Sequence, residues 1–256
     1  MIITDDLVYL HIPKTGGTFV EHVMQRVYAD KAQLYIDTST PAGRSALGAT
    51  HQHQPISEIP DAFRDRDVLI TVRNPYDQYV SSFEFKWWQK REGSVFKDEE
   101  MPGDYPDYPE LSFSEFLSAR NDWKLNVRLN SRHAKHLTDK NLGFVSWQLI
   151  RFAVPHPFKA VRAMDGPEEE CVFSEAMSRI TYIPTDNLNR GLYEFLISKG
   201  NDPNDVDFVL TLGKVYPPGS RRGEDRSWQS YYDPNLKAMV REKDRLLFKL
   251  FPHFDV

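Results

Sequence analysis

Residues 7–28 read LVYLHIPKTGGTFVEHVMQRVY and predict a strand, a tight loop and a helix in direct succession. The apolar run at 7–12 is typical of a short buried strand, and Pro13 ends it. From Phe19 onward, apolar residues recur at intervals of three and four, which is the periodicity of an amphipathic helix. A strand that leads through a loop into a helix opens many α/β folds.

A second succession of strand and helix lies at residues 68–83. The segment VLITV at 68–72 is rich in β-branched residues and predicts a buried strand. After Arg73-Asn74-Pro75, apolar side chains recur at helical spacing, namely Tyr76, Tyr79, Val80 and Phe83. Two strands that each run straight into a helix favour a parallel β-sheet flanked by helices. Since no linker interrupts the sequence, we expect an α/β fold in a single domain over residues 1–256.

Composition excludes several classes of protein. The 256 residues carry 32 basic and 37 acidic side chains, a net charge of -5, which argues against a dedicated nucleic-acid binder. Cys171 is the one cysteine, so neither an intrachain disulfide nor a Cys-x-x-Cys zinc site is possible. The sequence has no long apolar run and no basic signal-peptide start. We therefore expect a cytoplasmic protein without a membrane span.

The glycine loop, residues 13–18 (PKTGGT), has the composition of an anion-binding site. Gly16 and Gly17 allow a tight turn and let backbone N–H groups approach an anion. The following helix directs its unpaired N–H groups and the positive end of its dipole at the same place. Lys14 adds a full positive charge, and the hydroxyls of Thr15 and Thr18 add donors.

The glycine loop departs from the loop of nucleoside triphosphatases. The pattern GxxxxGK[ST] would require glycine where Pro13 stands and at the position of Val8. Those enzymes also place a Mg²⁺-binding aspartate after a second strand, where this sequence has Arg73. The sequence therefore predicts a cationic, metal-free site for a multiply phosphorylated ligand.

The two motifs resemble those of sulfotransferases that use 3′-phosphoadenosine 5′-phosphosulfate (PAPS). HIPKTGGT at 11–18 is similar to their 5′-phosphosulfate loop, and VRNPYDQYVSSF at 72–83 to their 3′-phosphate motif. The second motif resembles most the branch that includes bacterial and Golgi carbohydrate sulfotransferases. ITYIPTDNL at 180–188 is a weaker echo. The resemblance implies a P-loop-NTPase-like sulfotransferase fold, with PAPS as donor and adenosine 3′,5′-bisphosphate as product.

The resemblance also implies a role for each motif residue. Lys14 would stabilise charge on the bridging oxygen as the bisphosphate leaves. Arg73 and Ser81 would hold the 3′-phosphate, and Arg221 belongs to a loose candidate for a closing loop, SRRG at 220–223. The groups expected to hold the 5′-phosphate are those of Lys14, Thr15, Gly16, Gly17, Thr18 and Phe19.

A histidine of the segment THQH is the expected catalytic base, because neutral imidazole can accept a proton near neutral pH. In the resembling branch a histidine stands five residues before a Glu-Ile pair, and Glu58-Ile59 puts it at His53. The alignment is short, so His51 is the second choice. Asp37 and Glu21 follow as carboxylate alternatives.

Two other functions stay open at this stage. One is a kinase-like phosphoryl transferase on a related fold, against which Arg73 and the missing glycine count. The other is a non-catalytic nucleotide-binding module, which would not need a base. The acceptor of a sulfotransferase would be a hydroxyl or amine of a carbohydrate or small metabolite, and the sequence does not identify it.

Overall fold

A computed structural model describes residues 1–28, 53–89, 96–127, 129–215 and 227–256. The chain divides into two compact units. The first is built from Met1–Arg73, Arg151–Pro155 and Phe173–Arg221, and the second from Asn74–Ile150, His156–Val172 and Arg222–Val256. This division into compact units does not decide how many domains the chain has, and our expectation of a single domain stays a prediction.

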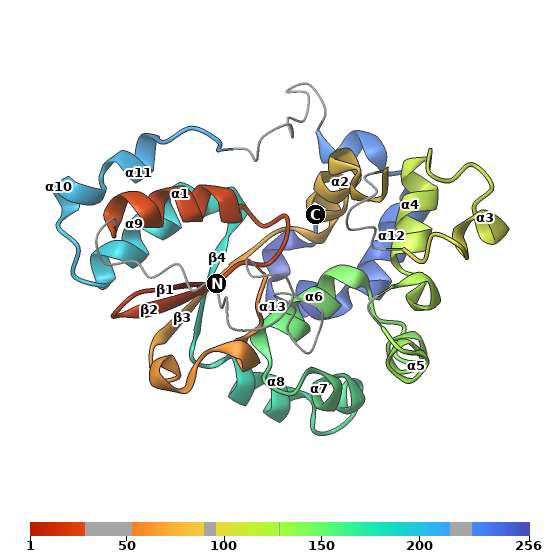
Figure 1. Cartoon of the computed structure of the whole chain (residues 1–256), viewed down its shortest axis with the longest axis horizontal. Coiled ribbons are helices and arrows are strands. Elements are labelled where there is room, and N and C mark those ends of the chain that lie inside the picture. Colours follow the sequence, from red (N-terminus) through yellow and green to blue (C-terminus); the bar gives the residue numbers. More distant parts are fainter. Residues whose placement is uncertain (29–52, 90–95, 128, 216–226) are drawn as a thin grey trace. The chain divides into compact units, whose positions relative to one another are not determined.

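The first unit contains a four-stranded sheet in the order β1-β2-β3-β4 (Figure 1). Its strands are β1 (Ile2–Ile3), β2 (Leu7–Leu10), β3 (Asp67–Val72) and β4 (Ile180–Pro184). β2, β3 and β4 run parallel, with Tyr9 beside Leu69 and Leu69 beside Thr181. The two strands expected from the sequence are therefore confirmed, and the structure shows in addition that they are neighbours whose carboxyl ends meet at one edge.

The sheet is mixed, so the expectation of a parallel sheet is wrong at one edge, where β1 pairs antiparallel with β2. Thr4 makes the reversal, because its hydroxyl accepts the N–H of Asp6 at 3.3 Å and that of Leu7 at 3.1 Å. Side-chain bonds of this kind stabilise tight turns. A strand of two residues carries too little pattern to be predicted.

Over the described residues, four helices that lie wholly in the first unit cover one face of the sheet. They are α1 (Gly17–Val27), α9 (Leu188–Ser198), α10 (Pro203–Val206) and α11 (Phe208–Thr211), and Figure 1 shows α1 and α9 beside the strands. Tyr9, Leu69 and Ile183 of the sheet are buried against Val20 and Leu192 of these helices. Burying such side chains is the main stabilising contribution, roughly 1.5–3 kcal/mol for each aliphatic one.

Short 3-10 helices lead into β3 and follow β4. Ile56–Glu58 and Asp61–Phe63 lie on either side of Pro60. Thr185–Asn187 connects β4 to α9.

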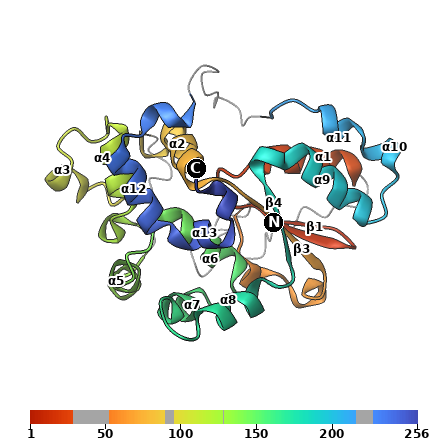
Figure 2. The same ribbon diagram turned by 180° about the vertical axis from the view of Figure 1, so that it is seen from behind.

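The second unit is helical over its described residues. α2 (Pro75–Phe85), α4 (Phe113–Arg120) and α12 (Pro234–Lys243) lie side by side (Figure 1, Figure 2). The other helices with residues in it are α3 (Met101–Asp104), α5 (Ser131–Asp139), α6 (Phe144–Ala153), α7 (Pro157–Ala163), α8 (Glu169–Met177) and α13 (Arg245–Leu250). Its 3-10 helices are Trp87–Gln89, Trp123–Leu125, Trp228–Tyr231 and Pro252–Phe254.

Helix α12 ends and helix α13 begins at Asp244, whose carboxylate is fully buried. It accepts the Tyr79 hydroxyl at 2.8 Å and the Ser146 N–H at 2.7 Å. Desolvation by burial raises the pKa of Asp244 to about 6. The apolar residues of 236–250 recur at helical spacing and so predict one continuous helix. The break is not visible in the sequence, because the partners of Asp244 lie far away in the chain.

Among the described residues, no helix is both long enough and apolar enough to cross a membrane.

Candidate active site

The glycine loop turns through two residues with left-handed backbone. Lys14 has φ 70° and Gly16 has φ 85°. Glycine adopts this conformation at no steric cost, whereas for a lysine it costs roughly 1–2 kcal/mol. A lysine held in such a conformation must be fixed by its surroundings, and such strain clusters at functional sites.

The amino end of α1 supplies backbone donors at the loop. The first helical N–H donors are those of Phe19 and Val20, which donate to the Gly16 carbonyl at 3.0 and 3.3 Å. The N–H groups of Gly17 and Thr18 precede them, in the turn whose donors find no carbonyl within a helix. This end of a helix carries positive partial charge and suits an anion.

Three buried hydroxyls connect strands β2 and β3 to the glycine loop. Tyr9 and Thr71 Oγ1 are 3.0 Å apart, Thr71 and Thr15 Oγ1 are 2.9 Å apart, and the Thr15 hydroxyl donates to the Ile12 carbonyl at 2.8 Å. Each hydroxyl has one proton, so the carbonyl fixes the direction. Thr71 must donate to Thr15, and Tyr9 to Thr71. Burial raises the pKa of Tyr9, which keeps its hydroxyl protonated as this direction requires.

The Arg73 guanidinium, at the carboxyl end of β3, reaches the loop backbone. Its Nη1 donates to the Lys14 carbonyl at 3.1 Å. Thr71 and Arg73 stand two residues apart in the chain, and each bonds one residue of the loop. The end of β3 therefore holds both Lys14 and Thr15.

His11 packs tightly against the start of α1. A Cβ on Gly17 would lie 1.8 Å from His11 Nε2, so only glycine fits there without moving the ring. His11 Nδ1 lies 2.9 Å from a carboxylate oxygen of Glu21, which can only accept, so Nδ1 carries a proton. Glu21, an alternative base from the sequence, is therefore bonded to His11.

His53 lies against the same histidine. Its Nδ1 is 2.9 Å from the His11 carbonyl oxygen, and the two rings meet edge to face at 4.6 Å. Since a carbonyl only accepts, His53 Nδ1 is the protonated nitrogen and Nε2 is the basic one. A backbone carbonyl that fixes the tautomer in this way is common for histidines that transfer protons.

The structure refines what the other loop residues can contribute. The Thr15 hydroxyl proton is used within the protein, so Thr15 is left with its backbone N–H as a donor to a ligand. Phe19 has its ring in the core and its N–H bonded to Gly16, and we leave it out of the proposed anion-binding set. Gly16, Gly17 and Thr18 remain in it.

Of the remaining expected residues, one belongs to the second unit and the others lie outside the described residues. Ser81 is half-buried in α2 and belongs to the second unit, so its pairing with Arg73 stays a prediction. His51, Arg221 and Asp37 lie outside the described residues.

Sequence reasoning missed Tyr9, Thr71 and His11. Thr71 and Tyr9 carry hydroxyls within otherwise apolar strands, which was a usable signal. His11 directly precedes the glycine loop, and its contact with Glu21 spans ten residues. Arg73 was expected at a phosphate, and its bond to Lys14 was not foreseen.

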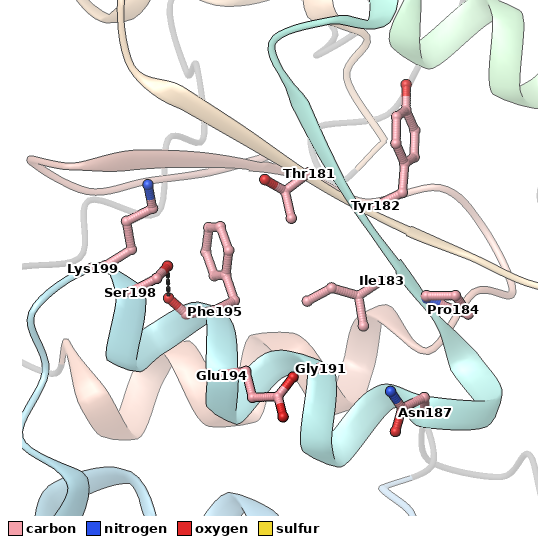
Figure 3. A pocket seen from close by; sticks show the side chains of 10 residues that line it. All are labelled: Thr181, Tyr182, Ile183, Pro184, Asn187, Gly191, Glu194, Phe195, Ser198 and Lys199. Carbon is pink, nitrogen blue, oxygen red and sulfur yellow. Dashed lines mark hydrogen bonds between the residues drawn. The ribbon is translucent and has the colours of Figure 1, made fainter.

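A pocket of about 390 Å³ lies elsewhere in the first unit, between β4 and α9 (Figure 3). Thr181 and Ile183 point from β4 toward α9, whereas Tyr182 points to the opposite side. Within it, Lys199 pairs with Asp67 and Ser198 donates to the Phe195 carbonyl. None of the expected site residues that the structure describes lines this pocket.

Comparison with known proteins identifies one family. The model of the Sulfotransferase family matches residues 2–152, more than half of the chain. The match includes the glycine loop, His53 and Arg73, and it runs through segments of both compact units. No curated protein matches the chain significantly.

Proposed function

The chain belongs to the sulfotransferase family, and on this premise we propose that it transfers a sulfuryl group from PAPS to a hydroxyl or amine. The acceptor class is a carbohydrate or small metabolite. The observation that carries the proposal is the left-handed backbone of Lys14 at the amino end of α1, bonded to Arg73.

The donors of the glycine loop fit the 5′-phosphosulfate of PAPS. Thr15, Gly16, Gly17 and Thr18 offer backbone N–H groups, and Lys14 adds a cation beside them. Arg73 and Ser81 are proposed to hold the 3′-phosphate, because the planar guanidinium of Arg73 can bind a phosphate through two N–H groups. This succession of strand, loop and helix supports a P-loop-like fold.

PAPS, when bound, would supply the sulfuryl group. The bond between the sulfur and the bridging oxygen would break as the sulfur forms a bond to the acceptor atom. Lys14 donates a hydrogen bond to that bridging oxygen, where negative charge develops. His53 Nε2 accepts the proton that the acceptor loses. The His11 carbonyl holds the proton on Nδ1 and so keeps Nε2 ready to accept one.

A thermal melt in the presence of nucleotides tests the proposal. PAPS and adenosine 3′,5′-bisphosphate should raise the melting temperature with EDTA present, and ATP with Mg²⁺ should raise it much less. Labelled PAPS and a panel of carbohydrate and small hydroxyl or amine acceptors then test transfer. Stabilisation by ATP with Mg²⁺ alone would favour a phosphoryl transferase and contradict the proposal.

A further inference from the structure

We propose that Arg73 is a positioning residue for Lys14, in addition to its proposed role at the 3′-phosphate. Through the Lys14 carbonyl, its guanidinium holds the left-handed turn of the glycine loop, and with it the direction of the Lys14 side chain. This inference rests on the proposed function, because it concerns the same loop.

One bond can fix the turn because a peptide unit is planar. The Lys14 carbonyl and the Thr15 N–H belong to one peptide unit and point in opposite directions. When Arg73 Nη1 binds the carbonyl at 3.1 Å, the Thr15 N–H is directed away from Arg73. Rotating this peptide would turn that N–H around and change the backbone angles of Lys14. Arg73 therefore sets a donor of the proposed 5′-phosphate site.

A second contact from β3 acts on the next residue of the loop. Thr71 is fully buried, and its hydroxyl donates to that of Thr15, 2.9 Å away. Its side chain has no exposed surface with which to bind a ligand, so Thr71 can affect binding only indirectly, and its bond to Thr15 leads to the loop. Thr71 thus gives an independent way to disturb the same turn.

The proposal differs measurably from a role at the 3′-phosphate alone. A residue that binds only the 3′-phosphate does not affect a nucleotide that lacks it. A residue that shapes the glycine loop affects every nucleotide that carries a 5′-phosphate. Adenosine 5′-monophosphate and adenosine 3′,5′-bisphosphate are therefore the two probes.

Calorimetry on the full chain compares four variants with these probes. Arg73→Ala should weaken both nucleotides at least tenfold, whereas Ser81→Ala should weaken the bisphosphate alone. Arg73→Lys keeps the charge but loses the planar guanidinium, and should restore bisphosphate affinity more than monophosphate affinity. Arg64→Ala, which removes an exposed arginine paired with Asp61, controls for loss of charge and should change neither.

Thr71→Val and Tyr9→Phe form a matched pair within the buried hydroxyls. Both lose a buried hydrogen bond, but only Thr71→Val removes the donor to Thr15. Thr71→Val should therefore weaken the monophosphate and lower kcat at saturating PAPS at least tenfold. Tyr9→Phe should lower the melting temperature, but its affinity for the monophosphate and its kcat should stay near those of the wild type.

The inference is overturned if Arg73→Ala weakens only the bisphosphate while Thr71→Val, still folded, keeps its kcat at saturating PAPS. If the monophosphate binds too weakly to measure, kcat of these two variants decides alone. A wild-type chain that binds neither nucleotide would instead refute the proposed function. The two failures are therefore distinguishable.

Discussion

Replacing Gly17 with alanine is a sharp test of the cluster at the start of α1. Alanine is normally the better helix former by about 1 kcal/mol. Here its Cβ would lie 1.8 Å from Nε2 of the His11 ring and also overlap two ring carbons. The ring has little room to move, because His11 is buried and bonded to Glu21 at 2.9 Å.

The expected loss of stability follows from these contacts. Overpacking costs roughly 1–3 kcal/mol, and losing the bond from His11 to a charged carboxylate costs roughly 1.5–3 kcal/mol. After the gain in helix propensity, Gly17→Ala should be less stable than the wild type by about 1.5–5 kcal/mol. The turnover rate should fall as well, since the backbone of His11 holds the proposed base His53.

Chemical denaturation and a turnover assay at saturating PAPS measure both effects. Gly213→Ala is the matched control in the same unit, because a Cβ there meets nothing within 4 Å. That variant should unfold at the same or a slightly higher denaturant concentration. If Gly17→Ala is as stable and as active as the control, the packing of His11 against the loop is not as described.

Three further predictions concern single side chains. Lys14→Ala should lower kcat about 100- to 1000-fold while bisphosphate affinity falls much less, because Lys14 acts where charge develops; steady-state kinetics and calorimetry separate the two. His53→Ala should abolish an activity that rises with pH through one ionisation, whereas His51→Ala should retain it; pH–rate profiles of folded variants decide, and near-normal turnover in both would move the base to Asp37. Burial raises the pKa of Asp244 to about 6, so the folded chain holds this proton more tightly than the unfolded chain. Its contribution to stability is present below about pH 4 and is lost as the pH rises through 6, about 3 kcal/mol in all. Urea unfolding from pH 4 to 7 should show this loss, and Asp244→Asn should reduce it.

The sequence predicts the parts of this fold that are encoded locally. Residues 7–28 and 68–85 carry strand and helix periodicities with a clear break between them, and β2, α1, β3 and α2 form there. The Asp233-Pro234 pair likewise starts α12, with the carboxylate accepting the Leu236 N–H at 2.8 Å. Propensity and capping suffice at these places because the determining residues are neighbours in the chain.

Contacts between distant residues could not be predicted in this way. The bond from Arg73 to Lys14 spans 59 positions, and the break at Asp244 depends on Tyr79, 165 positions away. His53 was preferred over His51 from a short alignment, and only the fold shows that His53 reaches the His11 backbone. Pairing of this kind depends on strand order and packing, which local patterns do not encode.

Calorimetric titration of adenosine 3′,5′-bisphosphate into the wild-type chain, in buffer with EDTA, tests the central claim most directly. The glycine loop and Arg73 supply backbone and hydroxyl donors and the two cations of Lys14 and Arg73, so the account predicts saturable binding of one nucleotide without metal. It also predicts that Lys14→Ala loses far more of its kcat with PAPS than of its affinity for this product. Binding that disappears on chelation, or that is replaced by a preference for ATP with Mg²⁺, would contradict the account.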